Sequence, residues 1–394
     1  MLLVKCDLLI KILLHINMYI SILNMPNNSV NSLHLESEYN ILVANTVDGF
    51  YLLKLPLTTT NYKSETLVPT GPFCVTYKPY LVRMISPFHC LFVTEKNNDP
   101  MLLTINVNDN DNAFPKSYTI MVFNTEQNKI ILHFTIGHKI TNIVTIDKYI
   151  LVITLNQILV YTQNIVNNLN DPNNVSFVKT IHTFTNPLGL CSAKSYKNNL
   201  VIATLGRTIG EVMICTLKKR SNIYIQAHTN TITNITLDDK CELISTTSNS
   251  GTLINVFDIS NCAKVYQFRR GIFGTTIHDV KFDASGNYIS CCSDNGTVHM
   301  FHLYDKCSES TDHKNTTSSF SIFGPIVPVC QSEWAYKLFK INQCVKSTCY
   351  FKKLNDKINI HITSNDFIYY IVNDIENNQD IVIKHDIGKL ITKS

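Results

Sequence analysis

Residues 243–258 (LISTTSNSGTLINVFD) and 288–303 (YISCCSDNGTVHMFHL) are the two segments that decide the fold of this chain. Both follow the pattern I-S-x-x-S-x-x-G-T-[LV], and their glycines, Gly251 and Gly296, lie 45 residues apart. A period of roughly 40–45 residues is typical of WD-type propeller blades, each of which is a four-stranded sheet. The two segments therefore predict neighbouring blades of a β-propeller.

The rest of the chain supports this interpretation. Short runs rich in Ile, Val, Thr and Tyr alternate with turn residues, as in residues 39–55 (YNILVANTVDGFYLLKL), which turn at Asp48-Gly49. This pattern indicates antiparallel hairpins, and residues 30–394 show no helical periodicity. We therefore predict an all-β, seven-bladed WD-type β-propeller over residues 30–394. We expect two long insertions, at residues 96–117 and 304–332, and loops of that length are usually functional or disordered.

The N-terminal segment, residues 1–29, is predicted to be an apolar extension outside the propeller. Its first 24 residues contain Lys5, Asp7, Lys11 and His15, whereas a membrane-spanning helix needs about 20 mostly apolar residues. A signal peptide would need an uncharged apolar block and a small-residue cleavage site, and neither is clear. There are two alternatives: the segment is a targeting segment, or the start codon is assigned too early and the folded part begins at Met25.

Composition excludes several classes of function. The net charge of +4 on 394 residues lacks the strong basic excess of a nucleic-acid-binding protein. The 13 cysteines follow no metal-ligand spacing and indicate small buried side chains in a reducing compartment. No phosphate-binding loop, metalloprotease motif or nucleophile elbow occurs, and Cys191 and His182 lack a third orienting group. We predict a protein that is not an enzyme and that has no metal and no cofactor.

The arginine pair Arg269-Arg270 is the candidate binding feature. Successive side chains of an extended strand point to opposite faces, so two adjacent guanidinium groups are placed to serve two separate sites. The planar donor fork of arginine matches a phosphate bidentately. Most surface arginines are simply solvated, so the surrounding residues must decide between these interpretations.

Residues 265–271 (VYQFRRG), 277–282 (IHDVKF) and 293–301 (SDNGTVHMF) resemble the hallmark segment of the PROPPIN (WIPI) family of phosphoinositide-binding propellers. Three further segments, 186–190 (NPLGL), 225–228 (IQAH) and 332–335 (SEWA), also resemble parts of this family. The resemblance is dense over residues 180–340. It implies two lipid-headgroup pockets, one on each side of the arginine pair.

We call the two implied sets of residues the Arg269 group and the Arg270 group. The Arg269 group is Arg269 with His228, Thr231, Ser248 and Thr252. The Arg270 group is Arg270 with His278, Ser293, Thr297 and His299. Hydroxyl and imidazole groups are compact donors for phosphate oxygens and inositol hydroxyls. The alternative is that the Ser and Thr residues only satisfy backbone groups of turns. Asn255 stands where the family usually has a basic residue, so we expect the Arg270 group to be the stronger site.

The second insertion is expected to contact the membrane. It contains the apolar sequence 319–329 (SFSIFGPIVPV), in which Pro and Gly make a regular strand or helix improbable. In the family the corresponding loop enters the bilayer, which implies five inserting residues: Phe320, Ile322, Phe323, Ile326 and Val327. The alternative is that the segment packs onto its own blade.

The resemblance implies a phosphoinositide effector that reads phosphatidylinositol 3-phosphate and 3,5-bisphosphate and acts in autophagy by recruiting partner proteins. We expect a monomeric cytoplasmic protein that associates peripherally with phagophore, endosomal or vacuolar membranes and does not bind nucleic acid. The implied protein partner is an autophagy-type lipid-transfer or tethering protein. Two alternatives stay open: a role in endolysosomal or other organelle maintenance, for example of plastids, and a scaffold propeller without lipid binding.

Overall fold

The computed structural model describes most of the sequence after residue 29. The described residues are 30–36, 41–46, 49–54, 69–73, 79–95, 118–163, 175–219, 221–303, 315, 332–341, 347–354, 357–364, 367–374 and 379–386. The predicted N-terminal extension and the first insertion lie outside them. So does the second insertion, apart from Asn315 and Ser332.

Every regular element among the described residues is a β-strand, and consecutive strands pair into sheets that we number in chain order. Sheet 1 contains β1 (Val30–Glu36), β2 (Ile41–Thr46), β3 (Gly49–Lys54) and β4 (Pro69–Phe73). Sheet 2 contains β5 (Leu81–Ser86), β6 (His89–Glu95), β7 (Tyr118–Asn124) and β8 (Lys129–Ile136). Sheet 3 contains β9 (Ile140–Ile146), β10 (Tyr149–Thr154), β11 (Gln157–Gln163) and β12 (Val175–His182). Sheet 4 contains β13 (Cys191–Tyr196), β14 (Asn199–Leu205), β15 (Glu211–Thr216) and β16 (Ile223–Gln226).

In the later sheets, one strand pairs with a sheet other than that of its neighbours in sequence. Sheet 5 contains β17 (Ile232–Leu237), β18 (Leu243–Ser248), β19 (Leu253–Asp258) and β20 (Lys264–Arg269), to which β24 (Glu333–Trp334) adds in parallel. Sheet 6 contains β21 (Ile277–Phe282), β22 (Tyr288–Ser293), β23 (Thr297–His302) and β25 (Lys337–Lys340). Sheet 7 contains β26 (Ser347–Leu354), β27 (Lys357–Ser364), β28 (Phe367–Asp374) and β29 (Gln379–Asp386).

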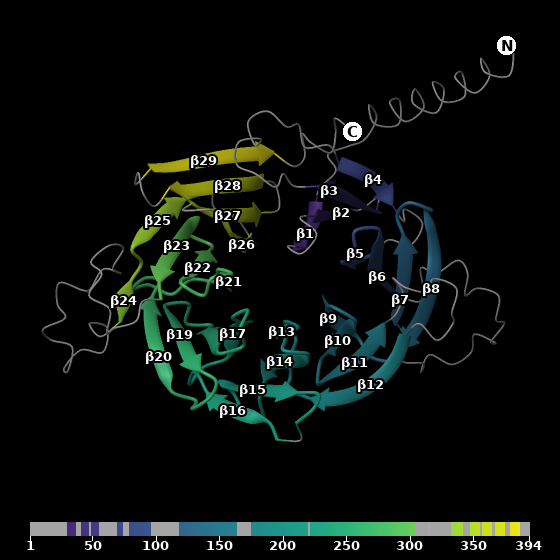
Figure 1. The fold of residues 1–394 in the computed structure, drawn as a ribbon, viewed down its shortest axis with the longest axis horizontal. Coiled ribbons are helices and arrows are strands. Elements are labelled where there is room, and N and C mark those ends of the chain that lie inside the picture. The colour runs from purple at the N-terminus through teal and green to yellow at the C-terminus, as the bar shows by residue number, and fades with distance from the viewer. Residues whose placement is uncertain are drawn as a thin grey trace, which may run out of the picture.

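These seven sheets, formed by the described residues, stand around a common centre, with the first strand of each sheet innermost (Figure 1). The innermost strands contact one another in order, from β1 to β5, β9, β13, β17, β21 and β26, and β26 contacts β1 again. The all-β propeller predicted from the sequence is confirmed.

The core lies between neighbouring sheets. Six buried apolar clusters within the described residues each join two consecutive sheets, from sheets 1 and 2 round to sheets 6 and 7. Successive side chains of a strand point to opposite faces of its sheet, so each sheet presents one set of Ile, Val and Phe side chains to each of its two neighbours. Burial of these side chains is the main force that stabilises the ring.

The two segments that predicted the repeat share one turn geometry. Gly251 and Gly296 have left-handed φ angles of 63° and 65°. Their amide groups donate to the carbonyl groups of Ser248 and Ser293, at 2.9 and 3.1 Å. Since left-handed backbone is cheap only for glycine, the turns explain why these glycines recur.

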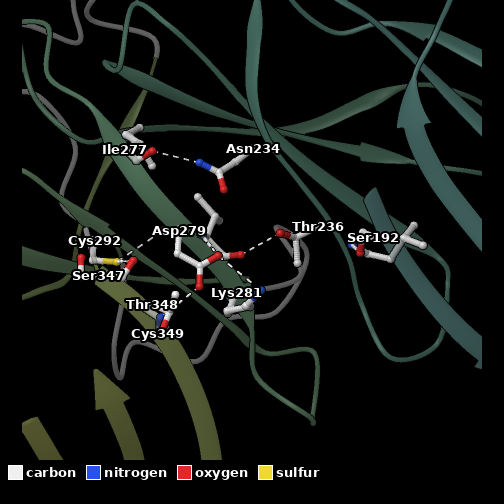
Figure 2. A network of polar contacts seen from close by, with 12 residues as sticks. Ser192, Asn234, Thr236, Ile277, Asp279, Lys281, Cys292, Ser347, Thr348 and Cys349 are labelled. Carbon is white, nitrogen blue, oxygen red and sulfur yellow. Dashed lines mark hydrogen bonds and ion pairs between the residues drawn. The ribbon is translucent and has the colours of Figure 1, made fainter. Parts of the chain in front are cut away.

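Polar contacts join the innermost strands, whose backbones share no ladder of hydrogen bonds (Figure 2). Three of them link sheets 5, 6 and 7: Asn234 Nδ2 to Ile277 O at 3.0 Å, Thr236 Oγ1 to Val280 O at 2.7 Å, and Cys349 N to Asp279 Oδ2 at 3.0 Å. Such bonds satisfy backbone groups that would otherwise be left unpaired.

A cavity of about 430 Å³ lies at the centre and is lined by residues of all seven innermost strands. Four of its charged side chains are paired, with 2.5 Å between Lys194 Nζ and Asp239 Oδ1 and 3.3 Å between Lys281 Nζ and Asp279 Oδ1. The Arg83 guanidinium group, also in the lining, donates to Ile143 O, Val82 O and Asn142 Oδ1. The Asp279 carboxylate raises the pKa of Lys281. The two ammonium groups of the cavity therefore already have carboxylate partners.

Candidate functional site

Strand β20 directs alternate side chains toward sheet 6 and sheet 4. On one face, the ring of Phe268 stacks 4.8 Å from the ring of Phe301, which belongs to sheet 6. On the other face, Gln267 Nε2 donates to Asn255 Oδ1 at 3.0 Å, and Asn255 contacts His228. The strand, which ends at Arg269, therefore has two different chemical surroundings, as the alternation rule requires.

Arg270 is 5% exposed and lies against the turn between β18 and β19. Its Nε donates to Gly251 O at 3.0 Å, its Nη2 donates to Phe273 O, and its backbone amide donates to Thr252 O at 2.9 Å. Burial lowers the pKa of its guanidinium group. Among the described residues Arg270 forms no salt bridge, so its charge is buried with carbonyl groups as its hydrogen-bond partners.

Arg269 is 6% exposed, and its Nε donates to Ser332 Oγ at 2.7 Å. Ser332 precedes β24, and Arg269 pairs with Trp334 of β24 on one side and with Leu253 of β19 on the other. The register therefore places Arg269 beside the turn that carries Ser248 and Thr252, and at the end of the second insertion.

The Arg270 group contains a buried neutral imidazole. Burial, with a smaller effect of the Arg270 charge, lowers the pKa of His299 to about 4. His299 Nε2 lies 3.1 Å from Thr297 Oγ1. The Ser293 hydroxyl is fully buried and has no hydrogen-bond partner among the described residues. Of these three side chains, His299 is the one close enough to Arg270 for the guanidinium charge to act on it.

His278 is engaged on both ring nitrogens. Its Nδ1 lies 3.0 Å from Ser347 Oγ, and its Nε2 lies 2.5 Å from Asp294 Oδ1. Burial acts to raise the pKa of Asp294, but hydrogen bonds from Thr276 and His278 outweigh it and lower the pKa. A Ser–His–Asp order resembles a hydrolase triad, yet Ser347 is 1% exposed, so this serine cannot reach a substrate.

The Arg269 group contains a second, half-buried imidazole. His228 Nε2 lies 3.0 Å from Thr246 Oγ1, and burial lowers the pKa of His228. Thr231 is exposed and its carbonyl accepts from Asn249 N at 2.9 Å, next to the buried Ser248. The structure thus brings Thr231 and Ser248 together at one end of sheet 5.

Asn255, the departure from the family pattern, has a structural role. Its Nδ2 donates to Ala227 O at 2.9 Å, and its Oδ1 accepts from Gln267. The side chain is 6% exposed. An amide in this position adds no charge to the Arg269 group, and the expected difference between the two groups stays a prediction.

Three contributors were missed by sequence reasoning. Asp294 is a hydrogen-bond partner of His278, Ser332 accepts a hydrogen bond from Arg269, and the Phe273 carbonyl accepts one from Arg270. A further repeat signal was available in Asp238 and Asp283, which are 45 residues apart. Each carboxylate accepts three backbone hydrogen bonds in the turn between the first and second strands of its sheet.

The buried histidines predict acid sensitivity. In the unfolded chain a histidine takes up a proton near pH 6.5, whereas folded His299 does so only near pH 4. The unfolded state therefore binds more protons as the pH falls below 6.5, and stability declines progressively from there to about pH 4. His299 alone should cost about 2 kcal/mol of unfolding free energy at pH 5.

Urea unfolding at pH 7.5 and pH 5.0 measures this loss. The variant His299→Gln should lose less stability than the wild type between the two pH values, whereas the exposed His133→Asn should match the wild type. An equal loss in wild type and His299→Gln would contradict the assignment.

The predicted inserting residues Phe320, Ile322, Phe323, Ile326 and Val327 lie outside the described residues. Within the part of the chain that the structure describes, no cluster of three or more His, Cys, Asp or Glu side chains has the arrangement of a metal site. The same residues contain no helix long and apolar enough to cross a membrane.

Known proteins are similar to parts of this chain. SVP1-like protein 2 of Neurospora crassa is 39% identical over 126 residues, which cover 32% of this chain and 28% of that protein. Autophagy-related protein 18 of Dictyostelium discoideum is 30% identical over 151 residues, covering 38% and 41% of the two chains. The chain thus aligns with less than half the length of these relatives.

Solved structures show the same fold. The crystal structure of Hsv2 from Kluyveromyces marxianus superposes with a TM-score of 0.61 at 16% identity, covering 91% of this chain and 99% of that one. A complex of KlAtg21 with the coiled-coil of AgAtg16 superposes with a TM-score of 0.60 at 17% identity. The sequence profile of the PROPPIN family matches residues 103–326, which is more than half of the chain, and the protein therefore belongs to the PROPPIN family.

Proposed function

We propose that this protein is a non-enzymatic phosphoinositide-binding effector that acts in autophagy by recruiting partner proteins to cytosolic membrane faces. The observation that carries the proposal is Arg270, a buried guanidinium group that lacks a carboxylate partner among the described residues. A buried charge without a counter-ion is costly, and a phosphate is the ligand that an arginine fork matches best. Family membership and relatives named autophagy-related protein 18 support the same function.

Two headgroup sites are part of the proposal. The Arg270 group would bind one phosphoinositide and the Arg269 group a second, with phosphatidylinositol 3-phosphate and 3,5-bisphosphate as the lipids. The insertion 304–332, with Phe320, Ile322, Phe323, Ile326 and Val327, would add a membrane contact to the propeller of residues 30–394. Several weak contacts with one membrane reinforce one another, because the later contacts form at high effective concentration.

The proposed partner is an autophagy-type lipid-transfer or tethering protein, bound by a monomeric propeller on phagophore, endosomal or vacuolar membranes. Support for a protein partner comes from the complex of KlAtg21 with a coiled-coil, which has the same fold. Fluorescent tagging during starvation separates this role from organelle maintenance, because a shift from cytosol to puncta is expected only for autophagy.

Liposome flotation tests lipid binding directly. Wild-type protein should float with vesicles that contain phosphatidylinositol 3-phosphate or 3,5-bisphosphate and should not float with phosphatidylcholine alone. The double variant Arg269→Thr, Arg270→Thr should lose the binding, and each single variant should lose roughly tenfold or more, since a charge-assisted hydrogen bond contributes about 1.5–3 kcal/mol.

Arg207→Thr is the matched control, because the Arg207 side chain is 67% exposed and lies over the ring of Tyr224 in sheet 4. It should float like the wild type. Flotation of the folded double variant at the wild-type level would contradict the proposal and favour a scaffold without lipid binding.

A further inference from the structure

The connection between β20 and β21 exposes two large apolar side chains directly after the arginine pair. Ile272 is 65% exposed and Phe273 is 83% exposed. They have the highest exposed fractions among the large apolar side chains that the structure describes. Since folding usually removes such groups from water, their exposure beside a proposed binding group calls for an explanation.

The backbone of this connection is fixed in place. Arg270 Nη2 donates to Phe273 O, so one guanidinium group contacts both the connection and the turn at Gly251. A Cβ atom on Gly251 would lie 1.6 Å from Thr275 O, which shows how closely the turn and the connection pack. Ile272 and Phe273 are therefore presented by a supported backbone.

The connection also contacts the turn of sheet 6 that carries the Arg270 group. Asp294 N donates to Thr276 O at 3.1 Å, and Thr275 Oγ1 lies 3.3 Å from Asn295 Oδ1. The apolar pair thus lies between the β18–β19 turn and the β22–β23 turn. These turns carry residues of the Arg269 group and the Arg270 group, respectively.

We propose that Ile272 and Phe273 form a membrane-inserting tip that enters the bilayer when the neighbouring arginine groups bind phosphoinositide headgroups. The inference rests on the proposed function and adds a second apolar contact to the insertion 304–332. A bilayer fits the observation better than a protein does. Two side chains are far less than the roughly 800 Å² per partner of a stable protein interface, whereas hydrocarbon accepts a small apolar tip without a matching surface.

The proximity to the arginine pair gives the tip its effect. Headgroup binding would place the tip at the lipid surface, where insertion of even a small apolar group strengthens attachment, because two weak membrane signals together give stable binding. Arg270 would link the two events, since the same guanidinium group lies at the headgroup site and supports Phe273.

Tryptophan fluorescence provides the direct test. The chain has one tryptophan, Trp334, so Phe273→Trp in a Trp334→Phe background reports on the tip alone. Vesicles of phosphatidylcholine with phosphatidylinositol 3-phosphate should shift its emission to shorter wavelength, and brominated acyl chains should quench it. Unchanged emission from protein that floats with the vesicles would overturn the inference.

A second variant tests the contribution to affinity. Ile272→Ser should weaken vesicle binding by about tenfold, given the apolar area removed, and should leave the affinity for soluble inositol 1,3-bisphosphate unchanged. Leu188→Ser is the matched control, because Leu188 is 59% exposed in the equivalent connection between β12 and β13.

The outcomes separate the two proposals. If the wild type binds vesicles and the serine variant binds equally well, the tip is wrong and the proposed function stands. If the serine variant also has a lower affinity for the soluble headgroup, the side chain acts on the arginine groups and not on the bilayer. If the wild type binds neither headgroup nor vesicles, the proposed function and the tip are both wrong.

Discussion

Phe268→Ala is expected to lower the free energy of unfolding by about 3–5 kcal/mol, the usual range for a buried phenylalanine truncated to alanine. Phe268 is fully buried, and its ring stacks 5.5 Å from Tyr266 and 4.8 Å from Phe301. The substitution would leave a cavity between sheets 5 and 6. Urea unfolding followed by circular dichroism measures the loss.

The matched control is Phe273→Ala, five residues further along the chain. Because Phe273 is 83% exposed, its truncation should change the unfolding free energy by less than about 0.5 kcal/mol. Similar losses in the two variants would show that the ring of Phe268 does not join the sheets as described. Since Phe268 directly precedes the arginine pair, its variant should also weaken vesicle binding.

Gly251→Ala is expected to displace the connection between β20 and β21. Alanine in left-handed backbone costs roughly 1–2 kcal/mol, and the new Cβ atom would meet Thr275 O at 1.6 Å. The connection must move to relieve this contact, so the loss of stability should exceed the backbone cost alone. Arg270 should lose its alignment with Gly251 O, and vesicle binding should fall with it.

Two glycines separate the backbone cost from the steric cost. Gly286 has a φ angle of 76°, and a Cβ atom added there would have no other atom within 4 Å, so Gly286→Ala should show the backbone cost alone. Gly271 lies in the connection itself and also has open space at this position, so Gly271→Ala should be close to neutral. A Gly251→Ala variant no less stable than Gly286→Ala would contradict the close packing of turn and connection.

The features that could be predicted from the sequence are local ones. The spacing of Gly251 and Gly296 shows that one structural unit is repeated along the chain. The residues of each turn recur because the hydrogen bonds that hold the turn are made within it. The opposite surroundings of Gln267 and Phe268 follow from the strand period, which needs no knowledge of the rest of the fold.

The features that could not be predicted depend on distant or three-dimensional context. Ser332 reaches Arg269 across 63 residues of sequence, and no local pattern marks that contact. Phe268 and Phe273 are both aromatic residues in short apolar runs, yet one is fully buried and the other is 83% exposed. Phe268 is buried because sheet 6 packs against it, and no local pattern in the sequence shows which aromatic ring sheet 6 will cover.

Strand β24 gives the second insertion two points of attachment. The chain leaves sheet 6 after β23, returns through Ser332 to pair with β20 of sheet 5, and then rejoins sheet 6 as β25. Asn315 Nδ2 contacts both His302 O, at 2.8 Å, and Glu333 Oε2, at 2.9 Å. The chain that follows the insertion is therefore held by both sheet 5 and sheet 6. A pulling force would therefore load the outer strands of both sheets that carry the arginine groups, and not one edge strand alone.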